Sequence, residues 1–291
     1  GLPERANFAP RDDEPVRIRQ AAFGYSHDEL DHLIEPMARD GKDPVGSMGD
    51  DTPLSVLTGV DRPLFSYFKQ LFAQVSNPPI DYIREELVTS LETRLGPQRN
   101  LLGESQEHAR QLVLDSPVLT DDTTARIKEM EGEDALHSAV VDTTFDPESS
   151  LKAAVERIRG EATAAIEDGA ELLVLSDRAV GPDRIPVPSL LATGAVHHEL
   201  VRNGLRNHAG LVVESADPRT VHHFATLVGY GAGAVNPYLA YQTIEDLVAG
   251  PDGADPDVAI SAYKKAIEDG LLKTMAKMGI STVESYQGAQ I

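Results

Sequence analysis

The feature that most constrains the fold is a regular alternation of short apolar runs with helix-like segments between residues 171 and 237. The runs read ELLVLS from residue 171, GLVVES from residue 210 and AVN from residue 234. About 20–35 residues separate them, which is enough for a loop and a crossover helix, so the pattern predicts βαβ units and a parallel sheet. Because the runs are apolar throughout, we expect this sheet to be covered on both faces.

Polar residues end each of these runs: Ser176 and Asp177, then Glu214 and Ser215, then Asn236. The carboxyl ends of parallel strands are where α/β proteins usually bind their ligands. Asp177, Glu214 and Asn236 are therefore strand-end candidates for a site. The alternative is that these side chains cap helices and close turns, and the fold alone does not decide between the two.

The rest of the chain gives further element predictions. Helices are expected over 26–41, where Ser26 and Glu29 form a capping box, and over 62–75, 80–96 and 120–130. A strand is expected over 137–145, and another begins at 280–283. The remaining helices are expected over 147–168, 189–205, 219–229, 239–248 and 257–278. The expected class is α/β, with an incomplete (β/α) barrel-like parallel sheet after a mainly helical, loop-rich N-terminal part.

Charge restricts the partners of the chain. The net charge is −21, from 47 acidic and 26 basic residues, which makes nucleic acid and anionic membranes poor partners. Eight of the basic residues are Lys. An acidic, Lys-poor surface is typical of a protein from a high-salt cytoplasm, where a Debye length of ~3 Å screens the repulsion. We therefore predict a halophilic-type surface.

The chain has no cysteine. This excludes a cysteine nucleophile, disulfides, zinc–thiolate sites and iron–sulfur ligation within these residues, and it fits a cytoplasmic protein. No apolar run reaches the ~18–20 residues of a membrane span. No metal site is predicted, because the pairs His197–His198 and His222–His223 are adjacent in sequence and point apart on a helix.

Two loops are candidates for a functional role. The glycine-rich loop contains Gly49, Asp50, Asp51 and Thr52. Paired aspartates there fit either Mg²⁺ binding and acid–base chemistry or, more simply, a turn cap. The second loop, Ser76 to Pro79, carries Asn77 and the rigid pair Pro78–Pro79.

Several strings resemble the central domain of the glutamate synthase large subunit, and together they cover nearly the whole chain. They include GSMGDDTPLSVLT, FSYFKQLFAQVSNPPIDYIREELVTSLETRLG, NLLGESQEHARQLVLDSPVL and GLVVESADPRTVHHFATLVGYGAGAVNPYLA. The tail, from KAIEDGLLK to the last residue, resembles the start of the FMN-binding domain that follows. Composition and periodicity divide the chain into an arm (1–22), a helical part (23–132) and a βα-repeat part (133–256), and the resemblance assigns 257–291 to the start of the FMN-binding domain.

The resemblance implies a role in ammonia assimilation and glutamate biosynthesis. Enzymes of this oxidoreductase family transfer the amide nitrogen of glutamine to 2-oxoglutarate, using NADPH, NADH or ferredoxin, FMN and an iron–sulfur cluster. Their central domain joins the amidotransferase and FMN domains and helps wall an internal ammonia channel. The resemblance implies that residues 1–291 hold no cofactor and are catalytically silent.

On this reading the tunnel-side or inter-domain contacts are Gly49, Asp50, Asp51, Thr52, Ser76, Asn77, Pro78 and Pro79. The alternative is a free-standing βα-barrel enzyme that binds a phosphate or flavin at Asp177, Glu214 and Asn236. A third possibility is a docking module without a tunnel wall. A complete barrel needs eight strands, which favours the first reading, because the sequence predicts only four or five.

Overall fold

The computed structural model describes residues 16–44, 62–69, 77–100, 102–130, 132, 135–249 and 254–289. The candidate residues Gly49, Asp50, Asp51, Thr52 and Ser76 lie outside these ranges. No helix within the described ranges is long and apolar enough to cross a membrane.

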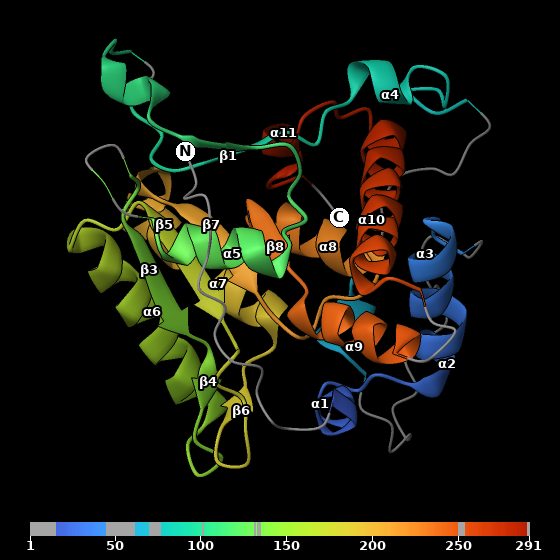
Figure 1. The fold of residues 1–291 in the computed structure, drawn as a ribbon. Helices are drawn as coiled ribbons and strands as arrows, with labels where there is room; N and C mark the ends of the chain where they lie inside the picture. The colour runs from blue at the N-terminus through green and yellow to red at the C-terminus, as the bar shows by residue number, and fades with distance from the viewer. Residues whose placement is uncertain are drawn as a thin grey trace.

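A four-stranded parallel sheet lies at the centre of the fold (Figure 1), in the order β3-β5-β7-β8. Its strands are β3 (Ser138–Asp142), β5 (Leu172–Ser176), β7 (Gly210–Glu214) and β8 (Ala234–Asn236). Every neighbouring pair is parallel. The strands predicted from the apolar runs are therefore confirmed, and so is the parallel sheet.

Helices cover the outer face of the sheet. They are α6 (Leu151–Glu167), α7 (Ser189–Arg202) and α8 (Val221–Gly229), each following a strand. Alternate strand residues Leu173, Leu175 and Leu211 point to this side and are fully buried in a cluster with α6 and α7. The crossover helices lie where the sequence predicts them because each needs an apolar stripe to cover the sheet. A small antiparallel pair, β4 (Thr144–Phe145) and β6 (Ile185–Pro186), extends from the sheet.

The inner face of the sheet is filled by the chain itself. Residues Leu172, Val174 and Val212 point to this face and pack against α5 (Asp121–Lys128) and the antiparallel pair β1 (Thr93–Leu95) and β2 (Leu112–Leu114). Figure 1 shows α5 lying across the sheet. In a closed barrel the remaining strands would pack on this face. The described residues thus form an incomplete barrel, as predicted.

Close packing at this inner face depends on glycines, and Gly233 is one of them. A Cβ atom at Gly233 would lie 2.3 Å from Cδ2 of Leu95 in β1. A Cβ atom at that distance would push the Leu95 side chain out of its position, so the glycine allows Leu95 to cover the amino-terminal end of the sheet.

The N-terminal helices pack against the last helices of the chain in the largest apolar cluster. They are α1 (Val16–Ala22), α2 (His27–Glu29), the π-helical turn η1 (Leu30–Ile34) and α3 (Glu35–Asp40), and they meet α9 (Tyr238–Val248) and α10 (Pro256–Met278). The predicted capping box is present, with Ser26 Oγ accepting from the Glu29 amide. The helix ends at Gly41, as predicted, with φ of 63°.

Four segments differ from the predictions. Residues 16–22, which the sequence places in an arm, form α1 with Arg19 and Gln20 buried. Within 62–69 the predicted helix is a single 3₁₀ turn, η2 (Leu64–Tyr67), because Phe65 turns into the core and Phe68 is extended. At 280–283 a single bridge between Ser90 and Thr282 replaces the predicted strand, and α11 (Val283–Tyr286) follows. Two further 3₁₀ turns are η3 (Gln106–Ala109) and η4 (Arg206–His208).

The fourth difference is the predicted helix over 80–96. It contains only one helical turn, α4 (Glu85–Val88), and then becomes β1. Leu91, Thr93 and Leu95 are buried while their neighbours are more exposed, a period of two that fits a strand. The period-four spacing of Ile83, Leu87 and Leu91 is misleading, since Ile83 and Leu87 are 68% and 83% exposed.

Candidate functional site

The carboxyl ends of the parallel strands bring the three predicted strand-end residues to one edge of the sheet, where all three are buried. Ser176 lies opposite Glu214 in the sheet, and Glu214 lies opposite Asn236. The amide of Asp177 donates to the carbonyl of Glu214 over 3.1 Å. The parallel register therefore places Ser176, Glu214 and Asn236 side by side, and Asp177 follows one residue later at the same edge of the sheet.

Glu214 is a buried carboxylate held between two cations. Its side chain is 2% exposed, and it accepts hydrogen bonds from Lys128 Nζ at 2.9 and 3.1 Å. Arg178 Nε donates at 3.1 Å and Ser176 Oγ at 2.5 Å. Burial by itself raises the pKa of Glu214, but Lys128 and Arg178 outweigh burial and lower it. The carboxylate is therefore ionised and neutralised in place.

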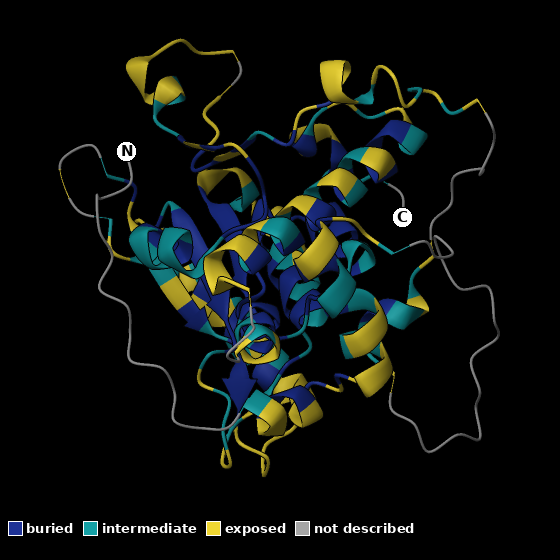
Figure 2. Cartoon of the chain, turned by 45° about the vertical axis from the view of Figure 1, so that its right-hand side comes forward, coloured by how far each residue is buried: buried dark blue, intermediate teal, exposed yellow. Residues whose placement is uncertain are grey.

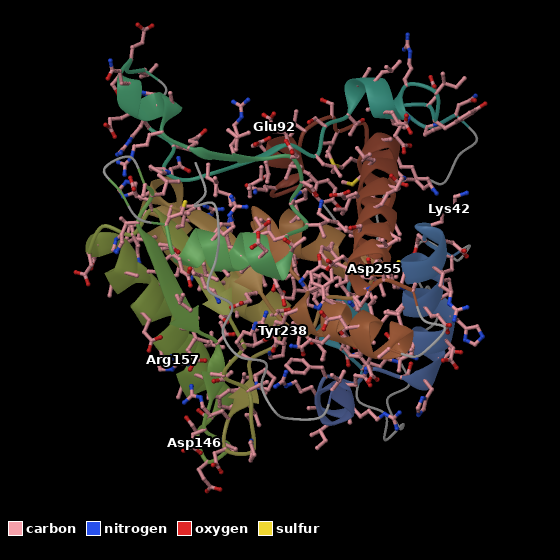
Figure 3. The ribbon with its side chains drawn as sticks, in the orientation of Figure 1. Lys42, Glu92, Asp146, Arg157, Tyr238 and Asp255 are labelled. Atoms are coloured by element: carbon pink, nitrogen blue, oxygen red, sulfur yellow. The ribbon has the colours of Figure 1, made fainter. Side chains whose placement is uncertain are left out.

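Arg178 joins this carboxylate to α5. It pairs with Asp121 Oδ2 at 3.1 Å, and its guanidinium lies 4.2 Å from the centre of the Tyr238 ring. Figure 3 shows Tyr238 in the interior of the molecule, where it is 1% exposed. Asn236 Nδ2 donates to Asp121 Oδ1 over 2.9 Å. The polar groups at the strand ends thus hold α5 against the sheet.

Asp177 is buried among neutral donors. The residue is 1% exposed, and its carboxyl group accepts hydrogen bonds from Ser215 Oγ at 2.5 Å and from the amide of Ala216 at 3.1 Å. Burial raises the pKa of Asp177 to about 7, although the hydrogen bond from Ser215 acts in the opposite direction. This aspartate closes the turn that follows β7, which is the structural reading weighed for it from the sequence.

Most polar atoms of this group have partners, but Asn236 Oδ1 is buried and accepts no hydrogen bond. The Glu214 carboxylate is engaged by Lys128 and Arg178, and α5 lies over the strand ends. To reach the strand ends, a ligand would have to displace α5 and break these ion pairs. We call this group, Glu214 and Asn236 with Lys128, Arg178 and Asp121, the plug. A pocket of about 700 Å³ lies elsewhere, lined among others by Arg110, Leu112 and Arg126.

The sequence gives no local signal for the partners of the plug. Lys128 lies 86 residues from Glu214, and Asp121 lies 115 residues from Asn236. Arg178 and Ser176, in contrast, flank the predicted site residue Asp177.

The described part of the second candidate loop rests on the end of α10. Asn77 and Pro79 are exposed. A Cβ atom at Gly279, the C-cap of α10, would lie 3.1 Å from Cβ of Pro79. The Asn77–Pro79 loop is therefore a rigid feature of the surface. It lies far along the chain from the strand ends. Among the residues that the structure describes, no hydrogen bond joins this loop to the plug.

The two histidine pairs pack against neighbouring residues and do not come together as metal ligands. His223 stacks on Phe65 with 4.2 Å between ring centres, and His222 Nε2 lies 3.0 Å from the Phe65 carbonyl. Arg206 Nε donates to His197 Nδ1 over 3.0 Å, and burial together with Arg206 lowers the pKa of His197 to about 4. Across the described ranges no three His, Asp or Glu side chains group so as to hold a metal ion.

The fold and the plug define a class: an α/β domain with a partial barrel whose interior its own helix fills. The model of the family described as "Glutamate synthase central domain" matches residues 18–291. The chain belongs to this family.

Curated relatives are large glutamate synthases. The chain is 46% identical over 274 residues to the NADPH glutamate synthase large chain of Bacillus subtilis, covering 94% of this chain and 18% of that one. It is 46% identical to the NADH glutamate synthase of Schizosaccharomyces pombe, covering 93% and 13%. With the rice ferredoxin-dependent chloroplastic enzyme it shares 44%, covering 96% and 18%. The chain thus spans less than a fifth of these relatives.

Among solved structures, a flavocytochrome b2 variant with sulfite bound matches 75% of this chain and 74% of that one. The TM-score is 0.41 and the identity is 10%.

Proposed function

We propose that these residues form the non-catalytic central domain of a glutamate synthase, which joins an amidotransferase domain to an FMN barrel domain and helps wall the ammonia channel between them. The whole enzyme would make glutamate from glutamine and 2-oxoglutarate in the cytoplasm. Its FMN, its iron–sulfur cluster and its contact with an electron-donating subunit or ferredoxin would involve other parts of the polypeptide. Residues 257–291 would lead into the FMN domain.

The plug at the strand ends is the observation that carries the proposal of a non-catalytic role. In barrel enzymes the carboxyl ends of the strands form the active site. Here Glu214 is neutralised by Lys128 and Arg178, and α5 covers the position where a ligand would enter. The family membership supports the proposed parent reaction, and the occupied strand ends support a scaffold role within it.

The loop at Asn77–Pro79 supports the conduit part of the proposal. Two consecutive prolines restrict the backbone, and the contact of Pro79 with the end of α10 adds support. A fixed backbone with small polar groups suits a path that passes neutral ammonia by hydrogen bonds. We assign Ser76 and the Gly49–Thr52 loop to the same tunnel-side or inter-domain role.

Coupling between the two half-reactions tests the conduit. In the full-length enzyme, Asn77→Ala and Asp51→Ala are expected to raise the ratio of glutamine hydrolysed to glutamate formed. Asn203→Ala is a matched control, because Asn203 is exposed at the end of α7. An unchanged ratio in both variants would argue against the conduit and leave a docking role.

A flavin titration tests the scaffold against the free-standing enzyme. We expect residues 1–291 to leave FMN fluorescence unchanged, because the strand ends are occupied. Stoichiometric binding that Glu214→Gln abolishes would instead make the strand ends a flavin site.

A further inference from the structure

A small cavity lies at the amino-terminal end of the parallel sheet, opposite the end that holds the plug. It is lined by residues of the segments 94–98 and 206–211, together with Gly233 and Gln287, and its volume is about 20 Å³. Figure 1 shows β1 crossing this end of the sheet, and Figure 2 shows the strands of the sheet as buried. A cavity of this volume has room for about one water molecule or one ion of similar size.

The lining of this cavity is electropositive, although the chain is acidic. It contains two arginines, Arg94 and Arg206, and no Asp or Glu. In the whole chain, by contrast, acidic residues outnumber basic ones by 47 to 26. Arg94 is already neutralised, because its Nη2 pairs with Glu92 at 2.9 Å outside the cavity. The positive charge that faces the cavity is therefore that of Arg206.

Within the described ranges, Arg206 has hydrogen-bond partners but no carboxylate partner. Its Nη1 donates to the carbonyl of Ala209 and its Nη2 to the carbonyl of Gly231, each over 2.9 Å. Its Nε donates to His197, which is neutral at pH 7 because its pKa is about 4. Burial lowers the pKa of Arg206, and no carboxylate acts in the opposite direction. A guanidinium has five N–H donors, so two remain for a further acceptor.

The backbone of the same cavity supplies another donor. Gly96 is buried, and the ladder between β1 and β2 ends one residue before it, at Leu95. Its amide donates to none of the residues that the structure describes. Buried amides without a partner are rare in folded proteins. A Cβ atom at Gly210 would lie 2.8 Å from the nitrogen of Gly96, so the missing side chain at Gly210 leaves this amide uncovered.

We infer that this cavity binds a single halide ion, chloride in ordinary salt solutions, between the guanidinium of Arg206 and the amide of Gly96. A partly buried cation that has only neutral acceptors is stabilised by an anion, and both groups are donors. The volume favours a monatomic ion, because a phosphate or carboxylate group has several heavy atoms and needs more room than one water molecule. The ion would join the segment after β1 to the segment before β7. The inference does not depend on the proposed function.

A comparison of two salts at equal ionic strength tests the site in solution. The Tm of residues 1–291 is measured in about 1 M KCl and in potassium gluconate, whose anion is too large for the cavity. Screening of the net charge is the same in both salts. With a Kd of about 0.1 M, chloride binding would add about 2 °C to the Tm in KCl. Arg206→Gln should lose this chloride-specific gain. Arg202→Gln is the matched control and should keep it, because Arg202 is 64% exposed on α7.

The quantity compared is the difference between the two salts within each protein. Arg206→Gln also loses its bonds to the carbonyls of Ala209 and Gly231, so its absolute Tm is expected to fall whether or not an ion binds. A salt difference in Arg206→Gln equal to that of the wild type would overturn the inference.

Bromide locates the ion in the wild-type protein, so this measurement stands even where Arg206→Gln does not fold. Bromide replaces chloride and scatters X-rays anomalously. In crystals of residues 1–291 soaked in sodium bromide, we expect an anomalous peak in contact with the Arg206 guanidinium and the Gly96 amide. Peaks at exposed side chains alone would indicate an adventitious ion only, and the halide site would then be wrong.

Discussion

Arg219 is the side chain whose removal we expect to separate the N-terminal helices from the βα part. It is 1% exposed, and its Nε pairs with Glu29 Oε1 at 3.0 Å. Its Nη2 donates to Glu29 Oε2 at 3.2 Å and to the carbonyl of Gly24 at 3.0 Å. The guanidinium also lies 4.3 Å from the centre of the Tyr25 ring. One side chain thus joins the loop before α8 to the start of α2.

Arg219→Met retains the length of the side chain and removes its charge and donors. Breaking a buried pair by removing one partner typically costs about 3–5 kcal/mol. Glu29 is 23% exposed and regains part of its hydration, so we expect the lower end, about 3 kcal/mol. With an unfolding entropy of about 2.1 cal/mol/K per residue, this corresponds to a Tm lower by roughly 5 °C.

Urea unfolding of residues 1–291 measures the loss, and hydrogen exchange locates it. The amides of the turn between α1 and α2 should exchange faster in Arg219→Met, because its carbonyl contacts lie there. Arg202→Met is the control, since Arg202 is 64% exposed and its pair with Glu199 lies on the surface. A cost below about 1 kcal/mol, or one equal to that of the control, would refute the argument that Arg219 holds the two parts together.

Three further predictions concern titration, packing and salt. Burial raises the pKa of Asp177 to about 7 in the folded protein, so its contribution to stability is present below its ordinary pKa and is lost as pH rises to about 7. Relative to Asp177→Asn, the wild-type free energy of unfolding should fall by about 2–3 kcal/mol between pH 5 and 8, and parallel profiles would contradict this. Gly233→Ala should cost about 1–3 kcal/mol in urea unfolding, because the added Cβ meets Leu95, whereas Gly160→Ala, which has open space in α6, should be neutral or stabilising. With a net charge of −21, the Tm should rise between about 0.1 and 2 M KCl, and a fall would exclude the halophilic-type surface.

The sequence by itself determined the elements whose signals are local. The strands β5 and β8 coincide with their apolar runs, because a strand buried on both faces needs a continuous apolar stretch. The capping box at Ser26 and the helix end at Gly169, with φ of 98°, follow from backbone donors and dihedrals that neighbouring residues satisfy. The parallel order then placed Asp177, Glu214 and Asn236 at one edge.

Only the tertiary structure decided what those strand ends do. Lys128 reaches Glu214 from 86 residues away, and this contact converts a candidate ligand site into a plug. The change from helix to strand after α4 was also set at a distance, because β1 pairs with β2 and seals the sheet with Leu95. Local propensity is worth tenths of a kcal/mol per residue, whereas buried pairing and packing are worth several, so the distant partners prevail.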